Sequence, residues 1–248
     1  MTATRRDTLL AWAMVSAVAF VLVVVLAPSA RGQASADGKA LFDTGCSSCH
    51  GVDGRGVADR GPTLEHSGEA AAFYEVSTGR MPLASSADSP VRKRAVYSQE
   101  EIDALVAYVG GLGDGPKLPE VSVANADVAA GGEVFRADCA PCHSASGAGG
   151  ALSYGHAAPS LGQADAQEIG AAVRSGPGQM PVFGTDALSE RDVDNVAAYV
   201  GYLQHPQDPG GLPIGRIGPV PEGFVAWFFG AGALLAIVAW IGTRDART

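Results

Sequence analysis

Cysteine is scarce in this chain, which has only four among its 248 residues. They form two pairs, each followed at once by a histidine, in "CSSCH" at 46–50 and "CAPCH" at 139–143. No cysteine remains for a long-range disulfide, and the spacing is too tight for a structural bridge in a small secreted fold. The cysteines therefore point towards a prosthetic group.

Basic residues are also few, above all in the second half. Residues 31–119 hold 9 Lys and Arg against 12 Asp and Glu, whereas residues 120–212 hold 3 against 11. Such an acidic surface repels nucleic acid and anionic lipid and attracts a basic partner, although it serves simple solubility equally well.

A convincing strand pattern is absent, because no region alternates apolar and polar residues in the manner of a β-strand. The predicted fold class is all-α. Since strands and helices do not alternate around the cysteine pairs, a thioredoxin-like redox site is excluded.

Charge is missing from two apolar runs of twenty residues, at 8–27 and 223–242. Each is long enough to cross a bilayer core of roughly 30 Å. Arginines precede the first run and follow the second, so the positive-inside rule places both chain ends in the cytoplasm and residues 28–220 outside. The small residues at 28–36 leave open a second interpretation, in which the first run is a cleaved signal peptide.

The sequence repeats itself. Aligning the two cysteine motifs gives an offset of 93, and three further blocks recur in the same order. They are "RGPTL" with "AAPSL", "STGRMP" with "GPGQMP", and "SQEEIDALVAYVGGL" with "SERDVDNVAAYVGYL". Four matched blocks indicate a duplicated domain, because the period is too long for a solenoid.

The repeat and the apolar runs divide the chain into seven predicted segments. These are an N-terminus with a membrane anchor or signal (1–36), a first domain (37–112), a linker (113–130), a second domain (131–204), a Pro/Gly-rich tether (205–222), a transmembrane helix (223–242) and a cytoplasmic tail (243–248).

The last block of each repeat predicts a helix. Ser98 with Glu101, and Ser189 with Asp192, have the spacing of an N-cap and the third helical residue, and apolar residues recur behind them at helical intervals. The first block predicts another helix, which leads into the cysteine motif with Phe42 facing inward.

The C-x-x-C-H pattern is typical of haem c. Two cysteines three residues apart lie close together on a helical turn, where both thiols reach the vinyl groups of one haem and the histidine ligates its iron. The candidate residues are Cys46, Cys49 and His50 for one haem, and Cys139, Cys142 and His143 for the other.

Methionine is the predicted second axial ligand of each iron. Met81 and Met180 occupy equivalent places in the repeat, 35 and 41 residues after the first cysteine of their motifs, and each precedes a proline. A thioether ligand raises the reduction potential and closes the iron to substrates, which suits an electron carrier. A lone methionine is usually core filler, and His156 is the best substitute for Met180.

Proline also recurs between each histidine and methionine, at Pro62 and Pro159. We expect the backbone carbonyl there to accept the other ring proton of the ligating histidine, although a plain loop-breaking role is the alternative.

Zinc is the competing metal, because paired C-x-x-C units also bind it. A shared zinc ion would leave the duplicated surroundings unexplained.

The two motifs, the two "MP" sites and the last span, "GPVPEGFVAWFFGAGALLAIVAWIGTR", together resemble the dihaem cytochrome c subunit of the actinobacterial cytochrome bcc complex, a menaquinol:cytochrome c reductase. The resemblance covers nearly all of residues 38–244, and "LFDTGCSSCHG", "GPTL" and "STGRMP" are its most specific parts. It implies two tandem cytochrome c domains with an N-terminal and a C-terminal transmembrane helix.

The same resemblance implies a path for electrons. They would pass from a Rieske iron-sulfur subunit, beside a cytochrome b subunit, through two covalently bound haems c to a cytochrome c oxidase. Quinol oxidation would occur on partner subunits, so no catalytic residue is expected here. Two other classes stay open, namely a free-standing membrane-anchored shuttle and the cytochrome subunit of a periplasmic dehydrogenase.

One segment distinguishes the repeats. In the first repeat 27 positions separate Met81 from Tyr108, whereas in the second only 19 separate Met180 from Tyr199. The additional segment of the first repeat contains "VRKR" at 91–94. Arg92, Lys93 and Arg94 are predicted to dock on an acidic face of a partner, with a solvated charge cluster as the alternative.

Overall fold

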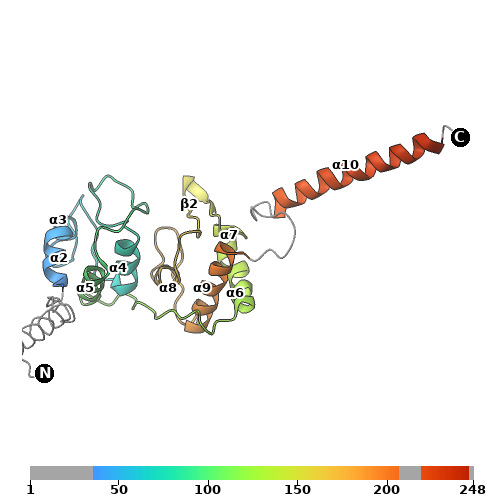
Figure 1. The fold of residues 1–248 in the computed structure, drawn as a ribbon. Coiled ribbons are helices and arrows are strands. Elements are labelled where there is room, and N and C mark those ends of the chain that lie inside the picture. The colour runs from blue at the N-terminus through green and yellow to red at the C-terminus, as the bar shows by residue number, and fades with distance from the viewer. Residues whose placement is uncertain (1–35, 207–218, 246–248) are drawn as a thin grey trace, which may run out of the picture. The chain divides into compact units, whose positions relative to one another are not determined.

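The computed structural model describes residues 36–206 and 219–245, which are mostly helical (Figure 1). The first apolar run and most of the predicted tether lie outside the described residues. The anchor or signal segment at the N-terminus therefore stays a prediction. The described residues from Asp37 to Pro206 form two packed groups of helices that contact each other.

The helices fall into two groups that follow the repeat. The first group comprises α2 (Gly38–Gly45), α3 (Ser47–His50), α4 (Gly68–Ser77) and α5 (Gln99–Gly110). The second comprises α6 (Val128–Val134), the π-helical turn η1 (Phe135–Cys139), α7 (Ala140–His143), α8 (Ala166–Ser175) and α9 (Glu190–Gln204). Both predicted capping boxes are present, at the starts of α5 and α9.

Each group encloses its own apolar core. Helix α5 packs against α2 and α4, and α9 packs against α6 and α8. The same aromatic pair recurs in both cores. The ring centroids of Phe42 and Tyr108 lie 5.1 Å apart and those of Phe135 and Tyr199 5.3 Å apart, with an interplanar angle of 49° in each pair. The two sequence repeats therefore fold with the same helix contacts and the same aromatic pair in their cores.

A glycine allows the first and last helices of each group to approach closely. A Cβ on Gly38 would lie 2.1 Å from the carbonyl oxygen of Ala104, and one on Gly131 would lie 1.9 Å from that of Asn195. Any side chain at either position would collide with the backbone of the facing helix. These glycines therefore fix where α2 crosses α5 and where α6 crosses α9.

One element departs from the all-α prediction. Strands β1 (Gly150–Ala151) and β2 (Ala157–Ala158) pair antiparallel around the short 3-10 turn η2 (Ser153–Gly155). The hairpin lies in the second repeat between the motif histidine and the proline, a distance of 16 residues there and 12 in the first repeat. Strands of two residues are too short to show a period in the sequence.

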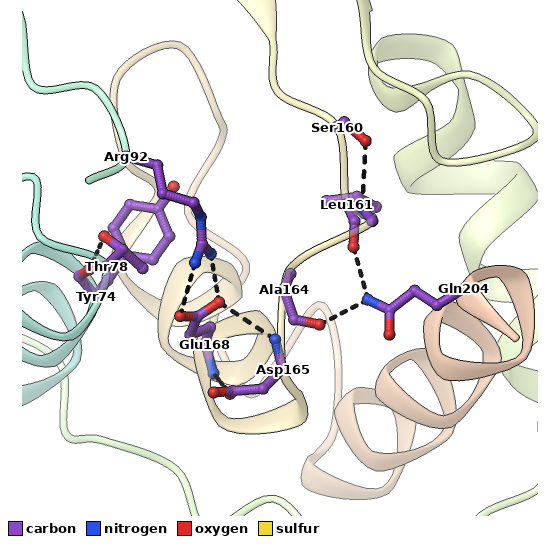
Figure 2. Close-up of polar contacts among 10 residues, drawn as sticks. Tyr74, Thr78, Arg92, Ser160, Leu161, Ala164, Asp165, Glu168 and Gln204 are labelled. Carbon is purple, nitrogen blue, oxygen red and sulfur yellow. Dashed lines mark hydrogen bonds and ion pairs between the residues drawn. The ribbon is translucent and has the colours of Figure 1, made fainter. Parts of the chain in front are cut away.

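The two groups contact each other through α4 and α8. Ala171 of α8 is fully buried in the cluster that contains Tyr74 of α4. Beside them, Arg92 donates hydrogen bonds of 3.2 and 2.5 Å to the two carboxylate oxygens of Glu168 (Figure 2). The Glu168 side chain is 8% exposed and that of Arg92 is 32% exposed. This ion pair joins a loop of the first repeat to a helix of the second.

The ion pair corrects the docking hypothesis for residues 91–94. Arg92 pairs with Glu168 within the chain, so its positive charge is compensated there. Lys93 and Arg94 are exposed, as is the residue Arg92 taken as a whole.

The predicted linker is held in place, and α6 begins inside its boundary, at Val128. Lys117 donates a hydrogen bond of 2.8 Å to Glu69 of α4. Gln167 of α8 donates one of 2.6 Å to the carbonyl of Pro119. Because these bonds reach both groups, the linker does not behave as a free tether between them.

The last described helix, α10 (Pro219–Asp245), extends beyond the predicted span at both ends. From Gly223 to Arg244 it is long and apolar enough to cross a membrane, by length and composition. The guanidinium of Arg244 lies 4.7 Å from the ring centroid of Trp240, near the end of this stretch. One candidate span is thus present among the described residues.

We expect Glu168→Gln to destabilise the protein, because Arg92 would keep its half-buried charge without a carboxylate partner. The free energy of unfolding should fall by about 2 kcal/mol. The amide can still accept the capping hydrogen bond from the Asp165 amide. Urea unfolding followed by circular dichroism measures the effect. Asp43→Asn is the matched control, because it removes an exposed pair with Lys39 and should cost less than about 0.5 kcal/mol. Equal losses in the two variants would contradict the assigned role of Glu168.

Candidate functional site

Each C-x-x-C-H motif lies on a helical turn that directly follows the first helix of its group. In the first motif the amides of Cys49 and His50 donate to the carbonyl of Cys46, at 3.1 and 3.0 Å. The second motif runs from the end of η1 through α7. Two thiols and an imidazole therefore come from one turn in each group, which is the arrangement that haem c attachment requires.

The ring of each motif histidine is oriented by a proline carbonyl. The Nδ1 atom of His50 lies 2.9 Å from the carbonyl oxygen of Pro62, and that of His143 lies 2.9 Å from the carbonyl oxygen of Pro159. A carbonyl only accepts hydrogen bonds, so Nδ1 carries the ring proton. The lone pair then resides on Nε2, where it is available to a metal ion. The predicted contact is confirmed in both repeats.

Two glycines that the sequence analysis missed make this contact possible. Gly56 and Gly149 adopt left-handed conformations, with φ of 85° and 90°. A Cβ would lie 2.8 Å from the carbonyl carbon of Pro62 in the first case and 3.0 Å from that of Pro159 in the second. Their amides donate to the carbonyls of the same motif histidines. The two glycines are 93 residues apart in the sequence, as the two cysteine motifs are, and this repetition could have identified them.

The four cysteines form no disulfide with one another and are all of intermediate burial. Burial raises the pKa of Cys46, and the neighbouring Cys49 adds to the rise. Burial raises the pKa of Cys139 to about 11, with the carboxylate of Asp138 contributing. Reactive-thiol chemistry needs a thiolate, so the raised pKa values of Cys46 and Cys139 disfavour that role.

The candidate methionines lie in the loops that follow α4 and α8. Met180 packs against the second core cluster, as Cys139 does, so the structure brings this residue and its motif to one core. The amide of Met81 donates a hydrogen bond of 2.9 Å to the carbonyl of Glu75. Both methionines are partly buried, whereas His156 is exposed. Ligation by either sulfur atom stays a prediction.

Arg174 holds the second methionine loop and was also missed in the sequence. Its side chain is buried, and its Nη1 donates to the carbonyls of Phe183 and Leu188, at 2.9 and 2.7 Å. Its Nη2 lies 2.8 Å from the carboxylate of Glu190. These bonds tie the loop that contains Met180 back to α8. A single arginine in a helix carries no sequence signature of such a role.

When the sequences are aligned at Met81 and Met180, Glu75 is the residue that corresponds to Arg174. Burial raises the pKa of this carboxyl group, while the positive charge of Arg80 opposes the rise. The two methionine loops are therefore built differently, although the motifs themselves are alike.

These residues fit a haem in each group. Every motif offers a pair of thiols for the vinyl groups and an imidazole whose Nε2 is free to ligate the iron. Within the described ranges, no group of three or more Cys, His, Asp or Glu side chains comes together as a metal site shared by the two motifs. The fold and the two sites define a c-type cytochrome with two covalently bound haems.

Known families match the same two parts of the chain. The family described as cytochrome c matches residues 35–113, and that of cytochrome c oxidase, cbb3-type, subunit III matches residues 126–200. The cytochrome bc1 complex cytochrome c subunit of Mycobacterium leprae is 42% identical over 215 residues, which cover 84% of this chain and 74% of that protein. The proteins of that name from Mycobacterium tuberculosis and Corynebacterium efficiens are 42% and 38% identical, over 84% and 85% of this chain and 77% of each relative.

The chain therefore belongs to the family of cytochrome c subunits of the cytochrome bc1 complex. Its two cytochrome c domains give it a role in electron transfer through haem.

Proposed function

We propose that this chain carries electrons from the Rieske iron-sulfur subunit of a quinol:cytochrome c reductase, through its two haems, to a terminal cytochrome c oxidase. The observation that carries the proposal is the repeated contact between histidine Nδ1 and proline carbonyl, at 2.9 Å in each domain. Two iron sites whose histidines are oriented by the same contact suit the transfer of electrons from one haem to the next, rather than catalysis at either iron. Membership of the bc1 complex family supplies the reductase context.

Each domain has its own set of ligands in this proposal. Residues 37–112 and 131–204 would each bind one haem c through their cysteine pair. Nε2 of the motif histidine ligates the iron on one side, and Met81 or Met180 ligates it on the other. With both axial positions filled, the irons exchange electrons without binding a substrate, so this chain needs no catalytic acid or base. Quinol oxidation belongs to the cytochrome b and iron-sulfur partners.

The membrane topology follows from the two apolar runs. We place both haem domains on the extracytoplasmic side of the cell membrane, with residues 8–27 as a first span and α10 as a second. Gly230 and Gly232 of α10 have no side chains, so another membrane helix can approach closely there. This supports assembly with other subunits over a free-standing shuttle.

Replacing the methionines tests the ligand assignment. Met81→Leu and Met180→Leu should each remove about half of the charge-transfer absorption band of methionine-ligated ferric haem, and should lower the potential of one haem, because a thioether favours ferrous iron. A pyridine haemochrome assay should still find two haems per chain. His156→Ala is the control and should leave the band intact. An unchanged band in either methionine variant, or its loss in the control, would refute the assignment.

Purification from native membranes in mild detergent tests the partners. Mass spectrometry should find cytochrome b, Rieske and oxidase subunits with the tagged chain. Recovery of the chain alone would favour a shuttle, and recovery of a dehydrogenase would favour the third class.

Lys93→Gln combined with Arg94→Gln should slow electron transfer to a partner at low salt, on the order of tenfold, and weaken its salt dependence. Arg136→Gln with Arg191→Gln, the same charge change at exposed sites of the second domain, is the matched control. Equal rates in the two double variants would remove docking at residues 93 and 94.

A further inference from the structure

Arg80, the residue immediately before Met81, is a buried cation with an unused hydrogen-bond donor. The residue is 9% exposed, and its Nη1 atom is buried without a partner in the part of the chain that the structure describes. A guanidinium stays protonated in proteins, so it cannot escape burial by losing its charge. A buried charge is stable only when it is paired and hydrogen-bonded. Arg80 therefore needs an acceptor at Nη1.

The neighbours of Arg80 meet this need only in part. Its Cζ atom lies 4.5 Å from the ring centroid of Tyr74, a cation–π contact. The carboxylate of Glu75 is close enough to interact electrostatically, yet its Oε2 atom is also buried without a partner. Two buried polar atoms without hydrogen-bond partners, one on each residue, allow two arrangements. Either they pair with each other, or Arg80 pairs with an anion that comes from outside the chain.

The second repeat favours the external anion. At the position of Arg80 it has Gln179, which is neutral and exposed. At the position of Glu75 it has Arg174, whose guanidinium bonds two carbonyls and one carboxylate of the chain. Arg174, whose role is structural, therefore has hydrogen-bond acceptors for its buried guanidinium within the chain. Arg80 differs from that pattern, and it does so next to the candidate iron ligand.

We propose that Arg80 binds a propionate carboxylate of the first haem and positions that haem in its domain. The inference rests on the proposed function, because it takes Met81 as a ligand of the same haem. Haem carries two propionates, and a guanidinium forms strong, charge-assisted hydrogen bonds with a carboxylate. Neutralising a propionate favours ferrous iron, since the ferric form is the one stabilised by a nearby negative charge. Arg80 therefore raises the potential of the first haem, whereas Gln179 provides no such charge at the second.

Spectroelectrochemical titration of the full-length, haem-loaded Arg80→Gln variant tests this role. At a fixed potential, the oxidised-to-reduced ratio of one haem should rise at least tenfold, equivalent to about 59 mV for one electron, while the other haem titrates as in the native chain. Arg80→Lys should restore part of the shift, because lysine keeps the charge but not the planar fork. Resonance Raman spectra should show a change in a propionate bending mode. Arg136→Gln, at an exposed site, is the control.

The outcomes separate this inference from the function on which it rests. Two haems and an intact methionine band in Arg80→Gln, with both potentials and all propionate modes unchanged, would overturn the inference alone. A lower melting temperature in that variant together with unchanged potentials would assign Arg80 to a structural pair with Glu75. Absence of the methionine band in the native chain would instead remove the ligand assignment itself.

Discussion

The hydrogen bond from histidine Nδ1 to a proline carbonyl is the contact on which each site depends. It sets the tautomer, holds the ring plane and leaves Nε2 as the metal-binding atom. Other local features serve it. A glycine in a left-handed conformation lets the loop pass close to the proline, and the helical turn of the motif delivers both thiols from the same side. The motif thus supplies two partly buried thiols and an oriented imidazole, which suits covalent haem attachment.

Several contacts join the two domains that carry these sites. Ala171 is buried in the core of the first domain, the Arg92–Glu168 pair joins the domains beside it, and the linker is bonded to both α4 and α8. These contacts are of three kinds: apolar packing, an ion pair between the domains, and side-chain bonds to the linker. Losing any one of them would leave the other two, so the relative placement of the domains does not depend on a single interaction.

Local features of the site were predictable from the sequence, and non-local ones were not. The cysteine motifs, the two capping boxes and the histidine–carbonyl contact repeat at matched positions, which makes the comparison of the two halves informative. The partner of Arg92 was not predictable, because a run of basic residues looks the same whether it is solvated or paired. The roles of Gly38 and Gly131 depend on the facing helix, and that of Arg174 depends on carbonyls of a loop that follows it in the chain. Spacing alone contains none of this information.

The central claim is that both irons are bound through Nε2 of a histidine whose Nδ1 carries a proton held by a proline carbonyl. Proton–nitrogen correlation NMR of the reduced, diamagnetic protein labelled with ¹⁵N-histidine measures this directly. We predict two ligating histidines, each with a slowly exchanging proton on Nδ1 and none on Nε2. A ligating histidine with its proton on Nε2, or only one ligating histidine in the chain, would contradict the account.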